Sequence, residues 1–157
     1  MTYPIIAAGS RLPPAKLNPP PWSSYGPGWS ATTTNPSIGN GSVAGRWRYL
    51  DPSVVEIAVV IRPGTTTSFG SGTYRLNLPV DAVAGGPDPL IQGVGLFGGA
   101  LYRFVGWANT SSTPASFVTL YRDNSTSENL TAWSPTAPVT FAAGHSVSFN
   151  GTYRVAW

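Results

Sequence analysis

Hydrophobic residues alternate with small or polar residues along most of this chain, at the two-residue period typical of β-strands. The clearest case is residues 54–61, where Val55, Ile57, Val59 and Ile61 fall on one side of an extended chain. β-branched side chains suit a pleated, half-buried surface. This segment therefore predicts a central strand with one face in the core.

A glycine-rich connection leads from this strand to a second alternating segment. Residues 62–72 contain three glycines, and Tyr74, Leu76 and Leu78 then share one face of residues 73–79. Pro79 lacks a backbone N–H, so we expect hydrogen bonding to stop on one side there. The two segments predict a strand pair on which the rest of the chain packs.

Seven further segments have strand-like alternation, and the pattern contains no helix of comparable strength. Asn40-Gly41 and Gly98-Gly99 are turn signals between them. About eight or nine strands, roughly ten residues apart, are typical of an all-β domain with two antiparallel sheets. We therefore expect a jelly-roll-like sandwich. The further segments are residues 30–34, 42–50, 91–97, 100–108, 116–122, 139–141 and 146–157.

The N-terminal segment differs from the rest in its proline content. Seven of the 16 prolines lie in residues 1–28, and proline fixes φ and removes a backbone donor. We predict an extended arm (residues 1–28) that docks on a neighbouring subunit or larger assembly, followed by a β-sandwich domain (residues 29–157). The alternative is a tail without fixed structure. The candidate docking residues are Ile5, Ile6, Arg11, Leu12, Leu17, Trp22 and Tyr25.

Composition and charge narrow the range of partners. Charged residues are only 10% of the chain, and the net charge of +3 comes from dispersed side chains. Nucleic-acid binding uses clustered Lys and Arg, so we expect no nucleic-acid partner. Residues 1–28 lack the pattern of a signal peptide, and no apolar run reaches the roughly 18 residues of a membrane span. We expect no membrane insertion.

Candidate catalytic residues are few. The single histidine, His145, follows a glycine and is interpreted as a turn residue, and there is no cysteine. Nothing in the pattern brings Glu56 and Glu128 together as a glycosidase pair. Asp81 and Asp88 share a loop, which leaves open a weak calcium site or simply two solvated acids. We predict no catalytic residue, no resident metal and no cofactor, and hence a non-enzymatic protein.

Tryptophan is frequent, with six residues in the chain. Core filling is the expected role of Trp47, Trp107 and Trp157. Trp133 lies in the long polar segment 123–138, so it is the candidate for an exposed contact with a sugar or a neighbouring chain. Local packing of Trp133 is the alternative.

Turn glycines, prolines and strand aromatics recur in a recognisable order along the chain. The stretches are Tyr3-Pro4, Ala8-Gly9-Ser10-Arg11-Leu12, Asn35-Pro36, Gly39-Asn40-Gly41-Ser42, Gly45-Arg46-Trp47, Thr65-Thr66-Thr67, Phe69-Gly70-Ser71-Gly72, Tyr74, Leu78-Pro79 and Gly151-Thr152-Tyr153. In these stretches the chain resembles small β-rich virion structural proteins, of the minor tail or capsid decoration type, from tailed phages that infect actinobacteria. The resemblance implies a component of the particle surface, assembled in the bacterial cytoplasm, and it carries no catalytic residues.

These observations together predict a non-enzymatic virion structural protein. We expect a capsid decoration (minor capsid) protein, anchored by its N-terminal arm and forming a homotrimer. Its partners would be copies of itself and the major capsid protein or other virion subunits. The alternative is a minor tail protein that binds host-surface glycan through the loop around Trp133.

Overall fold

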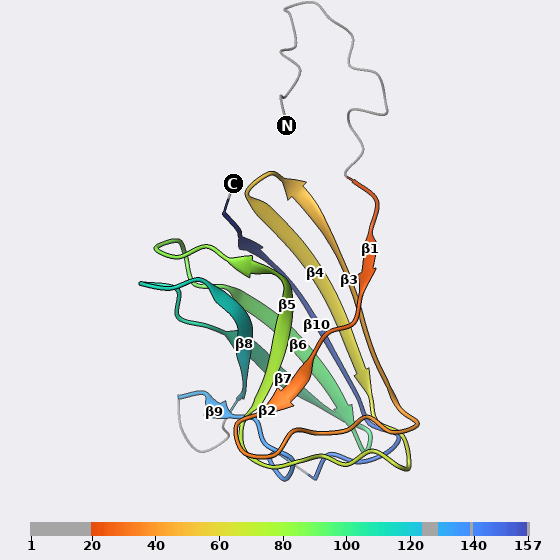
Figure 1. The fold of residues 1–157 in the computed structure, drawn as a ribbon. Coiled ribbons are helices and arrows are strands. Elements are labelled where there is room, and N and C mark those ends of the chain that lie inside the picture. Colours follow the sequence, from red (N-terminus) through yellow and green to blue (C-terminus); the bar gives the residue numbers. More distant parts are fainter. Residues whose placement is uncertain (1–19, 124–128, 139, 157) are drawn as a thin grey trace, which may run out of the picture.

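The computed structural model describes residues 20–123, 129–138 and 140–156, and within them it contains ten β-strands and no helix (Figure 1). It follows that these residues include no helix suited to crossing a membrane. The strands are β1 (Ser23–Tyr25), β2 (Trp29–Ala31), β3 (Ser42–Asp51), β4 (Val54–Arg62), β5 (Tyr74–Ala82), β6 (Leu90–Phe97), β7 (Ala100–Trp107), β8 (Ala115–Arg122), β9 (Thr131–Ala132) and β10 (Ser146–Arg154).

All ten strands belong to one antiparallel sheet, in the order β1-β3-β4-β10-β6-β7-β8-β5-β2, with β9 added beside β8. The sheet curls into a half-barrel (Figure 1). The all-β, antiparallel prediction is confirmed, but the expected division into two separate sheets is not seen. The β6–β7 hairpin explains the difference. It pairs without interruption from Leu90↔Trp107 to Phe97↔Ala100, so it joins the two halves through continuous hydrogen bonds.

The two outermost strands are consecutive in the chain and form a strap between the sheet edges. Tyr25 in β1 is the register partner of Gly45 in β3, and Trp29 in β2 is the partner of Leu76 in β5. Between them, the carbonyl of Gly28 accepts a hydrogen bond of 2.9 Å from the backbone N–H of Asn77. Residues 23–31 therefore connect the first edge of the sheet to the last.

Because of this strap, the domain begins before residue 29, which is where the sequence placed its start. Residues 20–28 of the predicted arm belong to the domain: Tyr25 packs into the space over Gly45, and the Arg48 guanidinium lies 4.5 Å from the centre of the Trp22 ring. Gly45 explains this docking, because a side chain at that position would collide with the Tyr25 ring. The other arm candidates (Ile5, Ile6, Arg11, Leu12 and Leu17) lie outside the described residues.

The core forms where the sequence pattern placed it. Val55, Ile57, Val59 and Ile61 are at most 3% exposed, and their strand β4 lies between β3 and β10. Burying each of these side chains stabilises the fold by roughly 1.5–3 kcal/mol, as an upper bound before chain entropy. The strand prediction for residues 54–61 is confirmed.

Two further predictions, one of a turn and one of the pairing near the end of a strand, are also confirmed. Gly98 and Gly99 have φ values of 57° and 89°, as a tight hairpin turn between β6 and β7 requires. β5 extends beyond Pro79 to Ala82, but its pairing with β8 lapses between Asn77 and Ala82. The proline thus interrupts hydrogen bonding on that side without ending the strand.

Candidate functional surface

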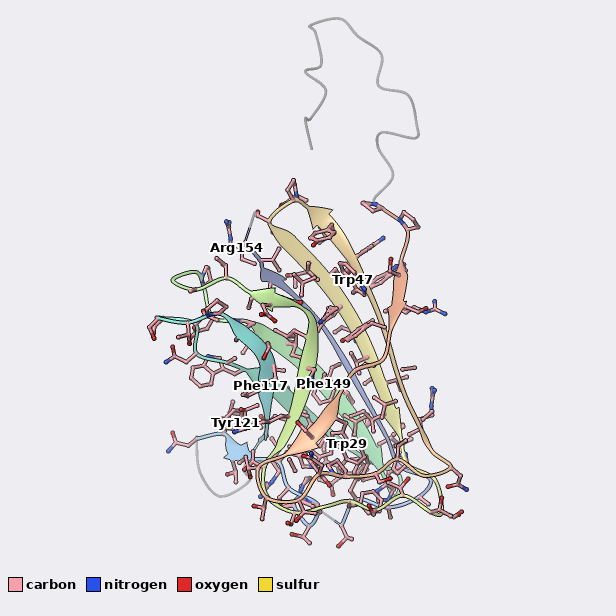
Figure 2. All side chains as sticks on the ribbon, viewed as in Figure 1. Trp29, Trp47, Phe117, Tyr121, Phe149 and Arg154 are labelled. Atoms are coloured by element: carbon pink, nitrogen blue, oxygen red, sulfur yellow. The ribbon has the colours of Figure 1, made fainter. Side chains whose placement is uncertain are left out.

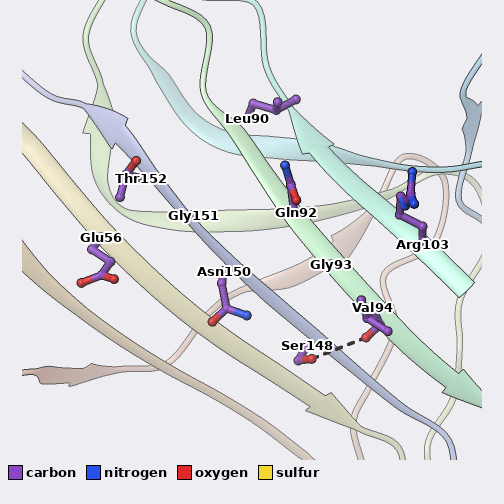
Figure 3. A pocket seen from close by; sticks show the side chains of 10 residues that line it. All are labelled: Glu56, Leu90, Gln92, Gly93, Val94, Arg103, Ser148, Asn150, Gly151 and Thr152. Atoms are coloured by element: carbon purple, nitrogen blue, oxygen red, sulfur yellow. Dashed lines mark hydrogen bonds between the residues drawn. The ribbon is translucent and has the colours of Figure 1, made fainter. Parts of the chain in front are cut away.

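The outer side of β4, β10, β6 and β7 forms a broad surface whose rows follow from the strand register. One row runs Val60, Ser148, Val94 and Arg103 across these four strands. A shallow groove of about 620 Å³ lies on this surface (Figure 3). It is lined by Glu56, Leu90, Gln92, Gly93, Val94, Arg103, Ser148, Asn150, Gly151 and Thr152.

The groove carries little unbalanced charge. The Oε2 atom of Glu56 is 2.6 Å from Nε of Arg48, and the Oδ2 atom of Asp123 is 3.7 Å from Nε of Arg103. The remaining polar lining is uncharged, and its Ser148 hydroxyl donates a 3.5 Å hydrogen bond to the Val94 carbonyl. Contacts in this groove would therefore depend on shape and hydrogen bonding rather than on electrostatic attraction.

Apolar side chains project outward from the β6–β7 hairpin beside this groove. Leu90, Val94, Leu96 and Leu101 are 51%, 50%, 44% and 72% exposed, and we call these four residues the hairpin patch. Leu96 and Leu101 are register partners, so their side chains are neighbours on the same face. Antiparallel sheets commonly place polar residues on the solvent side, and a gathered exposed apolar surface marks an interaction site.

Trp133 is not an exposed contact; of the two roles that the sequence left open for it, the structure shows local packing. Its side chain is 0% exposed, and its ring centre lies 4.5 Å from that of Phe104 and 4.9 Å from that of Tyr74. The Trp133 backbone N–H donates to the Leu120 carbonyl, and its own carbonyl accepts from Tyr74. These bonds to two distant strands draw the loop into the core, and local polarity gave no sign of them.

Trp107 shows the opposite discrepancy. Core filling was expected, but the ring lies on the outer face of β7 and is 36% exposed. The signal was present in the sequence, because strand alternation puts Trp107 on the same side as Leu101, Arg103 and Val105. The described residues thus contain an exposed tryptophan, at a position other than the one predicted.

His145 occupies a turn, as the sequence indicated. Its Nδ1 atom accepts a 3.1 Å hydrogen bond from the Ala142 backbone N–H, and its ring stacks on Phe97 at 4.9 Å between centres. These contacts give the imidazole a structural role. Glu128, like Trp157, lies outside the described residues.

The two aspartates that left a calcium site open differ in their surroundings. Asp88 Oδ1 accepts hydrogen bonds from the backbone N–H and the hydroxyl of Thr110, at 2.7 and 2.9 Å. These bonds, with a further one from the Trp107 side chain, lower the pKa of Asp88. Asp81 is exposed on β5. In the part of the chain that the structure describes, no group of three or more His, Cys, Asp or Glu side chains is placed to hold a metal ion.

Comparison of the chain with protein-family models, curated proteins and solved structures finds no match in any of the three. The resemblance to phage virion proteins therefore remains a prediction from the sequence.

Proposed function

We propose that this chain is a non-enzymatic structural protein of a bacteriophage particle: a capsid decoration (minor capsid) protein at the particle surface that assembles as a homotrimer. The observation that carries the proposal is the hairpin patch. A rigid sheet that exposes leucine and valine on its outer face suits a protein whose face is covered by another subunit. The neutral groove beside the patch adds hydrogen-bonding groups that such a contact can use.

The N-terminal segment supplies the proposed anchor. Residues 1–19 precede β1 in the sequence, and β1 pairs with β3 at one edge of the sheet. We assign the docking role to Ile5, Ile6, Leu12 and Leu17, with Arg11 as a charged contact. The partner would be the major capsid protein or another virion subunit.

A pair of deletions tests the anchor. Removing residues 1–19 should leave the melting temperature unchanged and abolish co-sedimentation of the protein with particles. Removing residues 1–28 should also lower stability, because it deletes β1 and uncovers Gly45 and Trp47 at the edge of β3. Incorporation of the 1–19 deletion at the wild-type level would contradict the docking role.

Sedimentation of the purified protein tests the patch. The wild type should sediment as a trimer, and Leu96→Asn or Leu101→Asn should shift it to monomer without a large loss of thermal stability. Leu130→Asn is the matched control, because Leu130 is 46% exposed but lies next to β9, which β8 separates from the hairpin. A wild type that stays monomeric at every concentration and never sediments with particles would overturn the proposal.

A minor tail protein is the second candidate for the particle location, since the same surface chemistry suits either place. Trp133 cannot serve as the glycan contact of such a tail protein, because its side chain is buried. Imaging of labelled particles separates a head location from a tail location.

A further inference from the structure

A second, smaller depression lies on the outer face where β7 leads into β8. Its volume is about 260 Å³, below the roughly 300–1,000 Å³ of drug-sized sites, so it suits a single small ring. We call it the Trp107 pocket. The lining side chains that bear on its chemistry are Trp107, Asn109, Thr113, Ser116, Phe117 and Thr119.

Two aromatic rings give the pocket an apolar surface. Trp107 is 36% exposed, and Phe117 and Tyr121, which are labelled in Figure 2, lie on the face of β8 opposite the buried Val118 and Leu120. Trp107 and Thr119 are register partners, which makes Phe117 the diagonal neighbour of Trp107 on the same face. The Arg75 guanidinium lies 4.6 Å from the centre of the Phe117 ring and holds that ring in place.

The polar lining carries hydrogen-bonding groups without charge. Asn109 Oδ1 accepts a 2.9 Å hydrogen bond from the backbone N–H of Ser111, which fixes the orientation of the side-chain amide. The NH₂ group of that amide then points away from Ser111 and can donate to a ligand. Thr113 and Ser116 are exposed hydroxyls, and Thr119 adds a third. No Asp, Glu, Lys or Arg lines the pocket.

The rim of the pocket is anchored by a buried polar residue. Thr110 is 0% exposed, and it is the one buried polar side chain among the described residues. Its hydroxyl and backbone N–H both donate to Asp88, and its carbonyl accepts a 2.6 Å hydrogen bond from the Gly85 backbone. The loop of residues 108–114 is thereby tied to the loop that precedes β6. A binding site whose rim is already ordered loses less conformational entropy when it binds.

From this arrangement we infer that the Trp107 pocket binds one ring of a neutral sugar. The C–H face of a pyranose or furanose would stack on the Trp107 indole, and its hydroxyls would bond to Asn109, Thr113 and Ser116. Aromatic side chains with an apolar body beside polar groups suit a ligand with one apolar and one hydroxylated aspect. Trp107 is the register partner of Leu90 in the hairpin patch, so the pocket adjoins that patch, and a subunit that covers the patch must leave the Trp107 ring open to the sugar.

Amide NMR of the ¹⁵N-labelled full chain tests this site. The probes are the methyl glycosides of glucose, galactose and mannose, together with dextran as a neutral polysaccharide. The Trp107 indole resonance is assigned by its loss in Trp107→Phe. At least one probe should give saturable shifts at Trp107, Asn109 and Ser116. Response to dextran alone would assign the site to a sugar within a chain, and response to a glycoside would assign it to a terminal or free sugar.

Substitutions decide whether the pocket is responsible. Trp107→Ala should weaken binding at least about tenfold, as loss of a stacking platform does, and Trp107→Phe should weaken it less. Trp22→Ala is the matched control, because Trp22 is 39% exposed but lies beside β1, and it should leave affinity within about twofold. The inference is wrong if no probe produces saturable shifts, if Trp107→Ala binds as the wild type does, or if cyclohexanol shifts the same resonances as strongly as the sugars do.

Discussion

Replacing Trp133 by alanine is the perturbation that most sharply separates the folded structure from the surface role that the sequence suggested. The side chain is fully buried, and its ring packs against Tyr74, Phe104 and Phe141 at 4.9, 4.5 and 5.3 Å between centres. Removing a buried aromatic side chain of this size costs about 3–5 kcal/mol. That is a large part of the roughly 5–15 kcal/mol by which domains are stable.

The structure also predicts how a smaller change behaves. The indole Nε1 of Trp133 is buried without a hydrogen-bond partner in the described structure. Trp133→Phe keeps most of the ring contacts and removes that unpaired donor, so the two effects partly offset each other. We expect a loss of about 1–2 kcal/mol for this variant. Trp107→Ala, on the outer face, is the comparator and should cost about 1 kcal/mol.

Urea unfolding followed by circular dichroism measures these differences by linear extrapolation. For a domain of this size, 3–5 kcal/mol corresponds to a fall of about 6–20 °C in melting temperature. The order of stability should be wild type, then Trp107→Ala and Trp133→Phe, and finally Trp133→Ala. If Trp133→Ala stays within about 1 kcal/mol of the wild type, the reasoning about the aromatic core is refuted.

Two further predictions concern the inner face of the sheet. In Gly93→Ala the new Cβ would lie 2.5 Å from the Phe149 ring, so we expect a loss of about 1–3 kcal/mol by overpacking, measurable as a lower urea midpoint. An unchanged urea midpoint would contradict this prediction and would mean that the Phe149 ring can shift without a cost in stability. Burial raises the pKa of Tyr74 and Tyr153 above the usual value near 10, so the unfolded state loses these protons first as pH rises. Stability should therefore fall above about pH 10, by up to about 1.4 kcal/mol per pH unit for each tyrosine, and the fall should be shallower in Tyr74→Phe; an equal slope in that variant would contradict the assignment.

Much of the fold can be predicted from the alternation of hydrophobic and polar residues alone. The inward face of β4 and the Gly98-Gly99 turn follow from local rules, because side-chain direction in a strand depends only on position along it. Strand pairing does not follow from such local rules, because paired strands can lie far apart in the sequence. The β1–β2 strap depends on the gap over Gly45, and nothing near Tyr25 in the sequence reveals that gap.

The candidate surface was harder to predict for the same reason. Trp133 lies in a polar segment, and it is brought into the core by backbone bonds to Leu120 and Tyr74 and by ring packing against Phe104. Alternation with Arg103 places Trp107 on the outer face, whereas the general tendency of tryptophan to fill cores predicts burial. Sequence patterns locate strand faces well, whereas they do not show which outward face remains uncovered in the folded chain.

The central claim is that this protein works by occupying the surface of a phage particle. Electron microscopy of purified particles, with the protein marked by gold-labelled antibody, tests it most directly. The account predicts gold on the outer surface of intact particles, at regular capsid positions, and no gold on particles that carry the 1–19 deletion. Bare particles, with the full-length protein left entirely in the soluble lysate, would contradict it.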